Sequence, residues 1–291
     1  MPAPVRRPRT TGELGRIRLA WEGEAYRQAP PAKLRPAAGA SRRPLVDHYA
    51  VYASESPEVP IAPSALVGKT VYPNFVHSRL GGRARTWHYR VVVVDAAGDR
   101  SRPSDTVAGT SVESVTVSGR PVATVGAFDH RSLELALAPA GSAQYTARFG
   151  TGVDFTHGVD APGVDWSYIH PGPADTWAGG RAHRFTFRFT LDSVPAGEAW
   201  LAIWLIDTHA TNPGVAVLGL NGTPVRQAAL ERGATRGSLE GDATLPGSPL
   251  KPSYLELPLP RAGLVAGANV VTVDKTAGSW HVYDALGVFE R

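Results

Sequence analysis

Short segments in which apolar and polar residues alternate recur along the whole chain. The alternation at 17–21, 87–95 and 184–190 has the two-residue period of a half-buried strand. Segment 201–206 is apolar on both faces, which predicts a central strand. No stretch keeps a helical period for three turns. The predicted strands are 17–21, 48–52, 87–95, 114–117, 132–137, 183–191, 199–206, 215–220, 254–257, 270–273 and 280–289.

The pattern divides the chain into a short start and two β-rich regions. Residues 1–12 are rich in Pro, Arg and Thr, and we expect them to form a flexible tail. Residues 13–110 carry the first strands, with a long loop predicted at 27–44, and residues 111–291 carry the others. A length of 291 residues suggests about two domains. We therefore predict an all-β protein made of two sandwiches, the second larger than the first.

Composition supports strands and turns, and it excludes several kinds of site. The 31 Gly and 25 Pro suit a chain of short strands. The absence of Cys removes disulfides, thiolate metal sites and cysteine nucleophiles. The net charge of +4 comes mostly from Arg, and the only basic run is at 6–9, so we expect no nucleic-acid partner. No apolar run is long enough to span a membrane as a helix, so we expect no membrane partner.

Residues 13–110 resemble a fibronectin type III domain. They have a Trp in an early strand, Trp21, and a Tyr in a late strand, Tyr89. The segment 94–104 reads Val-Asp-Ala-Ala-Gly-Asp-Arg-Ser-Arg-Pro-Ser, which is similar to the end of that fold. The resemblance implies a core role for Trp21 and a tyrosine-corner-like role for Tyr89. Modules of this fold are spacers or binding platforms, and the fold alone assigns no chemistry.

Residues 111–291 resemble the C-terminal carbohydrate-binding-module-like domain of rhamnogalacturonan lyases, polysaccharide lyase family 4 and relatives. The resemblance depends on the order of short motifs along about 165 residues. These motifs are 125–134, 165–168, 175–177 followed by 185–191, the Asn221-Gly222 turn, 264–272 and 283–290. The resemblance implies a jelly-roll (galactose-binding-like) β-sandwich.

Two departures from that family limit what the resemblance implies. The catalytic module of these lyases precedes the matched domains, and nothing in 1–110 is similar to it. Their middle domain is also a shorter immunoglobulin-like unit. The resemblance therefore implies an accessory region, with an upstream catalytic domain as a partner, and does not imply lyase activity in this chain.

The segment 165–181 carries the most functional content. It places aromatic rings among Gly and Pro between two strands, and exposed rings favour a ligand that stacks on them. A sugar ring can stack on an aromatic face while nearby polar side chains bind its hydroxyls or a carboxylate. The segment 278–281 can supply a second wall. The predicted carbohydrate-binding residues are Trp166, Tyr168, His170, Trp177, Arg181, Asp207, His209, Trp280 and His281.

Each of these residues also has a purely structural interpretation. The rings can cover the end of the sandwich as a small core, an alternative as strong as ligand binding for Trp166 and Trp177 and stronger for Tyr168. Asp207 and His209 follow a buried strand, where a strand-end hydrogen-bond pair is favoured over a metal or sugar site. Trp200 and Trp204 are predicted core residues.

No motif in the sequence indicates catalysis. There is no Gly-x-Ser-x-Gly elbow and no His-Glu-x-x-His, and we assign no catalytic residue. Nine His and 26 Arg supply candidates for a lyase site by chance alone. A structural Ca²⁺ held by carbonyls and carboxylates has no sequence signature in a sandwich, so the metal question stays open.

Three functions follow from these observations. The leading one is a non-catalytic, carbohydrate-binding accessory region that holds an acidic plant-type polysaccharide such as rhamnogalacturonan. The second is a polysaccharide lyase acting on rhamnogalacturonan, and the third is a structural or adhesive spacer without a sugar site. We expect a monomer that works outside the cell, although residues 1–7 lack the apolar segment of a signal peptide.

Overall fold

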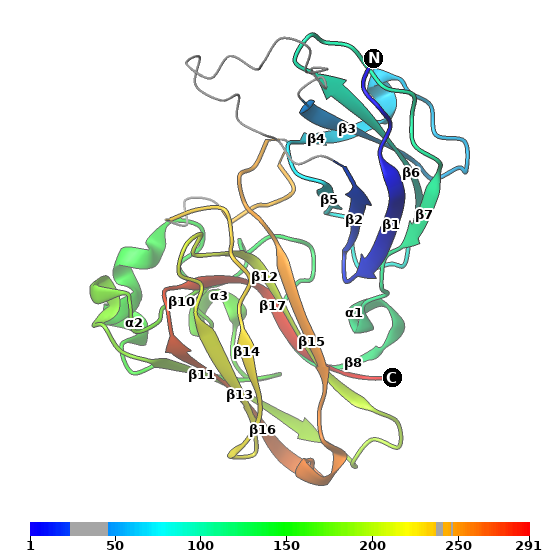
Figure 1. Ribbon diagram of the computed structural model, residues 1–291. Coiled ribbons are helices and arrows are strands. Elements are labelled where there is room, and N and C mark those ends of the chain that lie inside the picture. Colours follow the sequence, from blue (N-terminus) through cyan, green and yellow to red (C-terminus); the bar gives the residue numbers. More distant parts are fainter. Residues whose placement is uncertain (24–45, 237–240, 246) are drawn as a thin grey trace. The chain divides into compact units, whose positions relative to one another are not determined.

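The computed structural model describes residues 1–291 except 24–45, 237–240 and 246 (Figure 1). The chain forms two compact units, unit 1 from Met1 to Ser114 and unit 2 from Val115 to Arg291. Both are built from β-strands, which confirms the predicted all-β class. The loop predicted at 27–44 lies outside the described residues.

Unit 1 contains two sheets. One has three strands in the order β1–β2–β5, and the other has four in the order β4–β3–β6–β7. Trp21 packs edge-on against Tyr49 at 5.3 Å between ring centroids, and both rings are buried, so the predicted core role of Trp21 is confirmed. The elements are β1 (Arg6–Glu13), β2 (Arg16–Glu22), β3 (Val46–Ser54), η1 (Pro63–Ala65), β4 (Leu66–Thr70), β5 (Asn74–His77), β6 (Thr86–Asp95) and β7 (Val107–Thr110).

Unit 2 contains two five-stranded sheets. In one, β17 pairs with β12, which continues to β15, while β10 and β8 also pair with β17; the other runs β14–β13–β16–β11–β9. Its strands are β8 (Arg120–Gly126), β9 (Val153–Thr156), β10 (Ile169–His170), β11 (His183–Leu191), β12 (Ala199–Thr208), β13 (Val215–Leu220), β14 (Thr223–Ala229), β15 (Ser253–Pro258), β16 (Gly267–Ala277) and β17 (His281–Glu290). Its helices are α1 (Val115–Ser118), η2 (Gly141–Gln144), α2 (Tyr145–Phe149), α3 (Pro162–Asp165), η3 (Thr176–Ala178) and η4 (Arg261–Gly263).

The core of unit 2 follows the strand period. In β11, Phe185, Phe187 and Phe189 are buried while Arg184 and Arg188 point outward, as the alternation predicts. Strand β12 is covered on both faces and lies between β17 and β15, which confirms the predicted central strand.

The structure corrects several expectations. Residues 6–13 form β1, which pairs with β2, where a flexible tail was predicted. Residues 115–118 form the helical turn α1, and 132–137 form turns, where two strands were predicted. Trp204 is buried and packs against Phe128, as predicted for a core residue, whereas Trp200 is only partly buried. The hydroxyl of Tyr89 bonds the ring Nδ1 of His77 at 3.0 Å rather than backbone, unlike a tyrosine corner.

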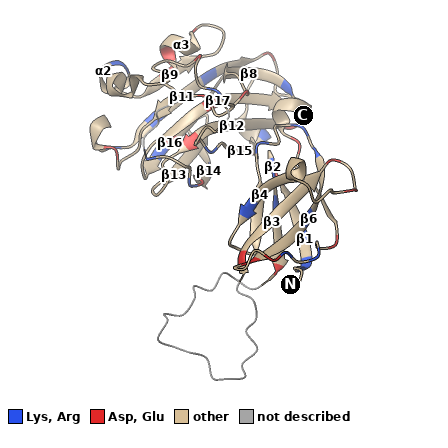
Figure 2. Cartoon of the chain, turned by 90° about the horizontal axis from the view of Figure 1, so that it is seen from above, with Lys and Arg blue, Asp and Glu red and all other residues tan. Residues whose placement is uncertain are grey.

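Charged residues are dispersed over both units. Figure 2 shows Lys and Arg interspersed with Asp and Glu along the strands and loops rather than gathered in one continuous stripe. Within the described residues, no helix has the length and apolar character needed to cross a membrane.

Candidate functional site

Three connections of unit 2 that carry predicted site residues meet at one end of the sandwich. They are the β10–β11 loop, the β12–β13 loop and the β16–β17 turn. The backbone N–H of Ala174 donates to the carbonyl of Gly278 at 3.0 Å, and the N–H of Ser279 donates to the carbonyl of Asn212 at 2.9 Å. The segment 278–281, predicted as a second wall of the site, therefore lies against the β10–β11 loop, with Trp280 and His281 buried.

Glycines allow these connections to approach so closely. A Cβ at Gly214 would lie 1.8 Å from the carbonyl oxygen of Ala277, and Gly214 has a positive φ of 72°. A Cβ at Gly172 would lie 2.4 Å from the carbonyl oxygen of Gly278. Backbone hydrogen bonds between the loops are possible only without these side chains.

Asp175 holds the β10–β11 loop in place. Its side chain is buried, and its Oδ1 accepts hydrogen bonds from Ser279 Oγ at 2.5 Å and Trp177 Nε1 at 3.2 Å. Its Oδ2 accepts from the backbone N–H of Gly172 at 2.8 Å. One carboxylate thus ties the loop to itself, to the β16–β17 turn and to an indole ring.

Trp177 and Arg181 are the predicted residues of this loop that reach solvent. The side chain of Trp177 is 42% exposed, and its ring makes a T-shaped contact with Tyr145, with 6.1 Å between ring centroids. Arg181 is exposed. Burial raises the pKa of the Tyr145 phenol, and the positive charge of the Arg181 guanidinium partly opposes that rise. An aromatic face and a cation therefore share the outer surface of the loop.

Most of the other predicted contact residues are buried, which removes them from the surface available to a polymer. The aromatic rings among them are buried because they carry much apolar area. The polar side chains among them can be buried because hydrogen bonds satisfy most of their polar atoms. The buried residues are Trp166, Tyr168, His170, Asp207, Trp280 and His281. For these positions the small-core interpretation matches the structure better than contact with solvent.

The buried histidines form a neutral cluster. His170 stacks on Phe185 with ring centroids 3.8 Å apart, its Nε2 donates to the carbonyl of His183 at 2.9 Å, and its Nδ1 accepts from the Tyr283 hydroxyl at 2.9 Å. Burial holds the pKa of His170 and of His281 well below 6.5. His281 Nδ1 has no hydrogen-bond partner among the described residues.

Sequence reasoning missed Lys275, a fully buried lysine beneath the loops. Its ammonium donates to the carbonyl oxygen of Pro213 in the β12–β13 loop. Burial lowers the pKa of Lys275 to about 7, and the charge of Asp175 opposes this effect. The signal was available, because Lys275 continues the inward positions Val271 and Val273 of β16.

Asp207 and His209 do not pair with each other. Asp207 Oδ1 accepts from the N–H of Ala234 at 2.8 Å, and its Oδ2 accepts from Thr235 Oγ1 at 2.5 Å. Asp207 therefore fixes a neighbouring loop. His209 is half-buried and its Nδ1 accepts from the N–H of Asn212 at 3.0 Å, which orders the β12–β13 loop.

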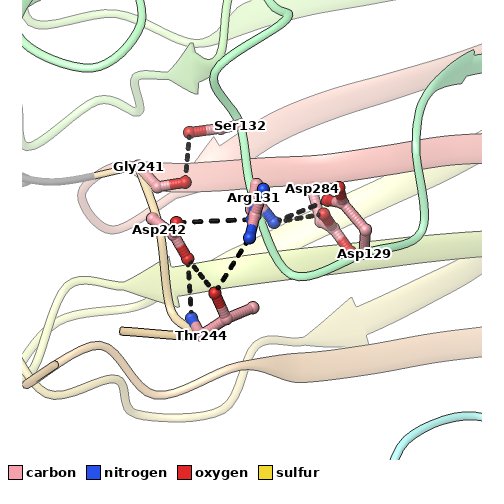
Figure 3. A network of polar contacts seen from close by, with 7 residues as sticks. All are labelled: Asp129, Arg131, Ser132, Gly241, Asp242, Thr244 and Asp284. Atoms are coloured by element: carbon pink, nitrogen blue, oxygen red, sulfur yellow. Dashed lines mark hydrogen bonds and ion pairs between the residues drawn. The ribbon is translucent and has the colours of Figure 1, made fainter. Parts of the chain in front are cut away.

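A second polar cluster surrounds the buried Asp284 (Figure 3). The N–H of Arg131 is shared between Asp284 Oδ1 at 2.9 Å and Asp129 Oδ1 at 3.0 Å. The Arg131 guanidinium lies 3.3 Å from Asp242, which in turn accepts hydrogen bonds from Thr244. The cluster ties the segment after β8 to the segment before β15.

The acidic groups of this cluster bear on the open question of a structural Ca²⁺. Burial raises the pKa of Asp284 to about 8, and the charges of Asp129 and Glu134 add to the rise. A protonated carboxyl is a poor cation ligand, whereas a bound cation would favour its ionised form. Among the described residues, no group of three or more His, Asp or Glu side chains is arranged to hold a metal ion.

Comparison with known proteins gave matches among solved structures alone. No family model matches the chain, and no curated protein matches it. The chain is similar to an α-L-rhamnosidase from Dictyoglumus thermophilum at 12% identity and a TM-score of 0.27, covering 94% of this chain and 25% of that one. It is similar to a family 35 carbohydrate-binding module from an environmental isolate at 13% identity and a TM-score of 0.24, covering 48% and 88%.

A third similar structure is described as one of the carbohydrate-binding modules from the β-sandwich superfamily, with 10% identity, a TM-score of 0.21 and coverage of 100% and 98%. The chain spans 25% of the D. thermophilum rhamnosidase and 22% of a Streptomyces avermitilis one. At such TM-scores these likenesses carry no argument about the ligand. None of these proteins is a rhamnogalacturonan lyase, so that resemblance stays a prediction.

Proposed function

We propose that unit 2 is a carbohydrate-binding module whose ligand contacts the surface formed by Trp177 and Arg181. One observation carries the proposal, which is that an exposed indole ring is held in a fixed position by a buried carboxylate. Trp177 is 42% exposed, and its Nε1 donates to Asp175. Large exposed aromatic side chains on ordered loops favour a ligand that covers them.

The chemistry of this surface suits a sugar. An aromatic face packs against the C–H groups of a pyranose ring while a neighbouring guanidinium binds hydroxyls or a carboxylate. Asp175 fixes the loop before the ligand arrives, so little conformational entropy is lost on binding.

The finer parts of the proposal concern the polymer and its setting. Arg181 adds a cation, which supports an acidic chain of the rhamnogalacturonan type over a neutral one. We further propose that the protein is an accessory region that acts outside the cell, where such polymers occur. The second candidate function is a polysaccharide lyase that acts on rhamnogalacturonan. It rests on the motif resemblance alone.

Affinity electrophoresis through gels containing rhamnogalacturonan, polygalacturonate or galactan tests the proposal. We expect retention in at least one acidic polymer, and Trp177→Ala should weaken it about tenfold, the equivalent of about 1.4 kcal/mol. Val265→Ala is the matched control, because Val265 is also exposed, at 49%, but precedes β16, whose far end carries the loops of the site.

Two results would contradict the proposal. Equal retention of the native protein and Trp177→Ala in every polymer removes the role of the indole ring. Retention in none of the polymers favours the spacer. A rise in unsaturated-uronate absorbance when the chain is incubated with rhamnogalacturonan would instead support the lyase.

A further inference from the structure

Unit 1 has a groove on the outer face of its four-stranded sheet. Two adjoining hollows of about 340 Å³ and about 710 Å³ share His48 and Lys69 as lining residues. The groove is defined by His48, Tyr52, Lys69, Tyr72 and Arg100, and is called the basic groove below.

The strand register brings these side chains to one face. His48, Ala50 and Tyr52 alternate along β3, opposite to the inward residues Tyr49 and Val51. On β4, Lys69 pairs with Ala50. Apolar side chains form the floor of the groove and basic ones line it.

The charges of the groove are only partly neutralised. Of the basic side chains that line the groove, His48 lies against an acid: its Nδ1 is 2.7 Å from Oδ2 of Asp47, which also lines the larger hollow. The Arg100 guanidinium lies over the Tyr52 ring, 5.9 Å from its centroid, and donates to the Tyr52 hydroxyl. Among the described residues, neither Lys69 nor Arg100 forms an ion pair. The groove thus presents two cations that form no ion pair within the described residues, above an apolar floor, and its one acid, Asp47, lies against His48.

An exposed aromatic ring extends this surface. Tyr72 is 65% exposed and lines the larger hollow together with Lys69. Its backbone N–H donates to Thr70 Oγ1 at 3.1 Å, which fixes the turn that carries the ring. Cations beside a solvent-facing ring match a chain that offers both carboxylates and flat apolar faces.

We propose that the basic groove binds an acidic polysaccharide, with Lys69 and Arg100 meeting uronate carboxylates and Tyr72 stacking on a sugar ring. The two connected hollows allow several residues of one chain to lie along it. This inference rests on the proposed carbohydrate-binding function and assigns a separate uronate-selective surface to unit 1.

Calorimetric titration of the full chain with oligogalacturonate and with neutral galacto-oligosaccharide at low salt tests the inference. Lys69→Ala and Tyr72→Ala should each weaken oligogalacturonate binding about fivefold, the equivalent of about 1 kcal/mol, and leave neutral oligosaccharide binding unchanged. Lys69→Arg should retain most of the affinity. Lys251→Ala is the matched control, because it removes the same charge from unit 2 and should have no effect.

Each outcome separates this inference from the Trp177 site. Oligogalacturonate binding that falls in Trp177→Ala but not in Lys69→Ala or Tyr72→Ala overturns the basic groove and keeps the proposed function. Binding that falls in the groove variants but not in Trp177→Ala keeps the groove and overturns the Trp177 site. Oligothymidylate serves as a polyanion without sugar carboxylates. If Lys69→Ala weakens oligothymidylate binding as much as oligogalacturonate binding, the proposed uronate selectivity of the basic groove is overturned, because the groove would then attract any polyanion.

Discussion

Replacing Lys275 by Met should change how the stability of unit 2 depends on pH. Lys275 is fully buried at the base of the three meeting loops, and its ammonium bonds the Pro213 carbonyl. Burial lowers the pKa of its ammonium from the ordinary 10.5 to about 7. The unfolded chain therefore binds a proton at Lys275 between about pH 7 and 10.5 that the folded chain has lost, and the free energy of unfolding rises with pH across this window.

The magnitude follows from the two pKa values. At about 1.4 kcal/mol per pH unit, the interval from about 7 to 10.5 corresponds to at most about 5 kcal/mol. This stability is fully present above the unfolded pKa and is lost as the pH falls through the folded pKa. Met keeps a similar length without a charge, so Lys275→Met lacks the dependence, while loss of the bond to Pro213 adds an offset independent of pH.

Urea unfolding at intervals from roughly pH 6 to pH 9.5 measures the effect. Above pH 7, the free energy of unfolding of the native protein should rise relative to that of Lys275→Met by about 1.4 kcal/mol per pH unit. The variant is therefore most stable, relative to the native protein, at pH 6. The difference between the two proteins cancels the contributions of titrating groups far from Lys275. The charge of Lys275 also lowers the pKa of His170 and His281, but both values lie well below 6.5, so the range above pH 7 reports on Lys275 itself. A difference that stays constant within about 0.5 kcal/mol over this range would refute the reasoning.

Two further predictions concern buried polar groups of unit 2. Burial raises the pKa of Asp284 to about 8, so between about pH 4 and 8 the folded chain keeps a proton that the unfolded chain releases. The free energy of unfolding therefore falls as the pH rises through this window. Asp284→Asn lacks this loss, so urea unfolding should show it gaining about 1.4 kcal/mol per pH unit relative to the native protein. Asn269 is fully buried with four side-chain hydrogen bonds, and Asn269→Ala should lower the free energy of unfolding by about 2–4 kcal/mol, against little change for the exposed Asn212→Ala.

The strands of both cores could be predicted because burial imposes a period on the sequence. Residues 183–191 and 215–220 were predicted with the same ends that the structure gives. Strand β1 was missed because its Arg and Thr side chains remain largely exposed and leave little alternation to read. Residues 114–117 alternate over too few positions to distinguish a strand from the helical turn α1.

The sequence predicted which segment carries the candidate site, but not which side chains of that segment are exposed to solvent. Aromatic rings at 165–181 look alike in sequence whether they face a ligand or the core. Trp166 is buried because its ring packs between the two sheets, on Phe155 and Phe185 of one sheet and Tyr283 of the other. Trp177 reaches solvent because it lies on the outer side of the short helix η3, whose next residue, Ala178, is buried. That difference depends on contacts far apart in the chain.

Burial of the predicted rings and histidines gives them a supporting role beneath the surface that we assign to the ligand. Asp175 binds the indole of Trp177 from below, and Ser279 of the β16–β17 turn binds the same carboxylate oxygen. Lys275 joins the β12–β13 loop to β16 through Pro213. An aromatic surface on a loop can hold a sugar only if the loop keeps its shape, because an ordering cost on binding would offset the stacking energy. The buried polar cluster is therefore better understood as the support of a rigid binding surface than as a hidden active site.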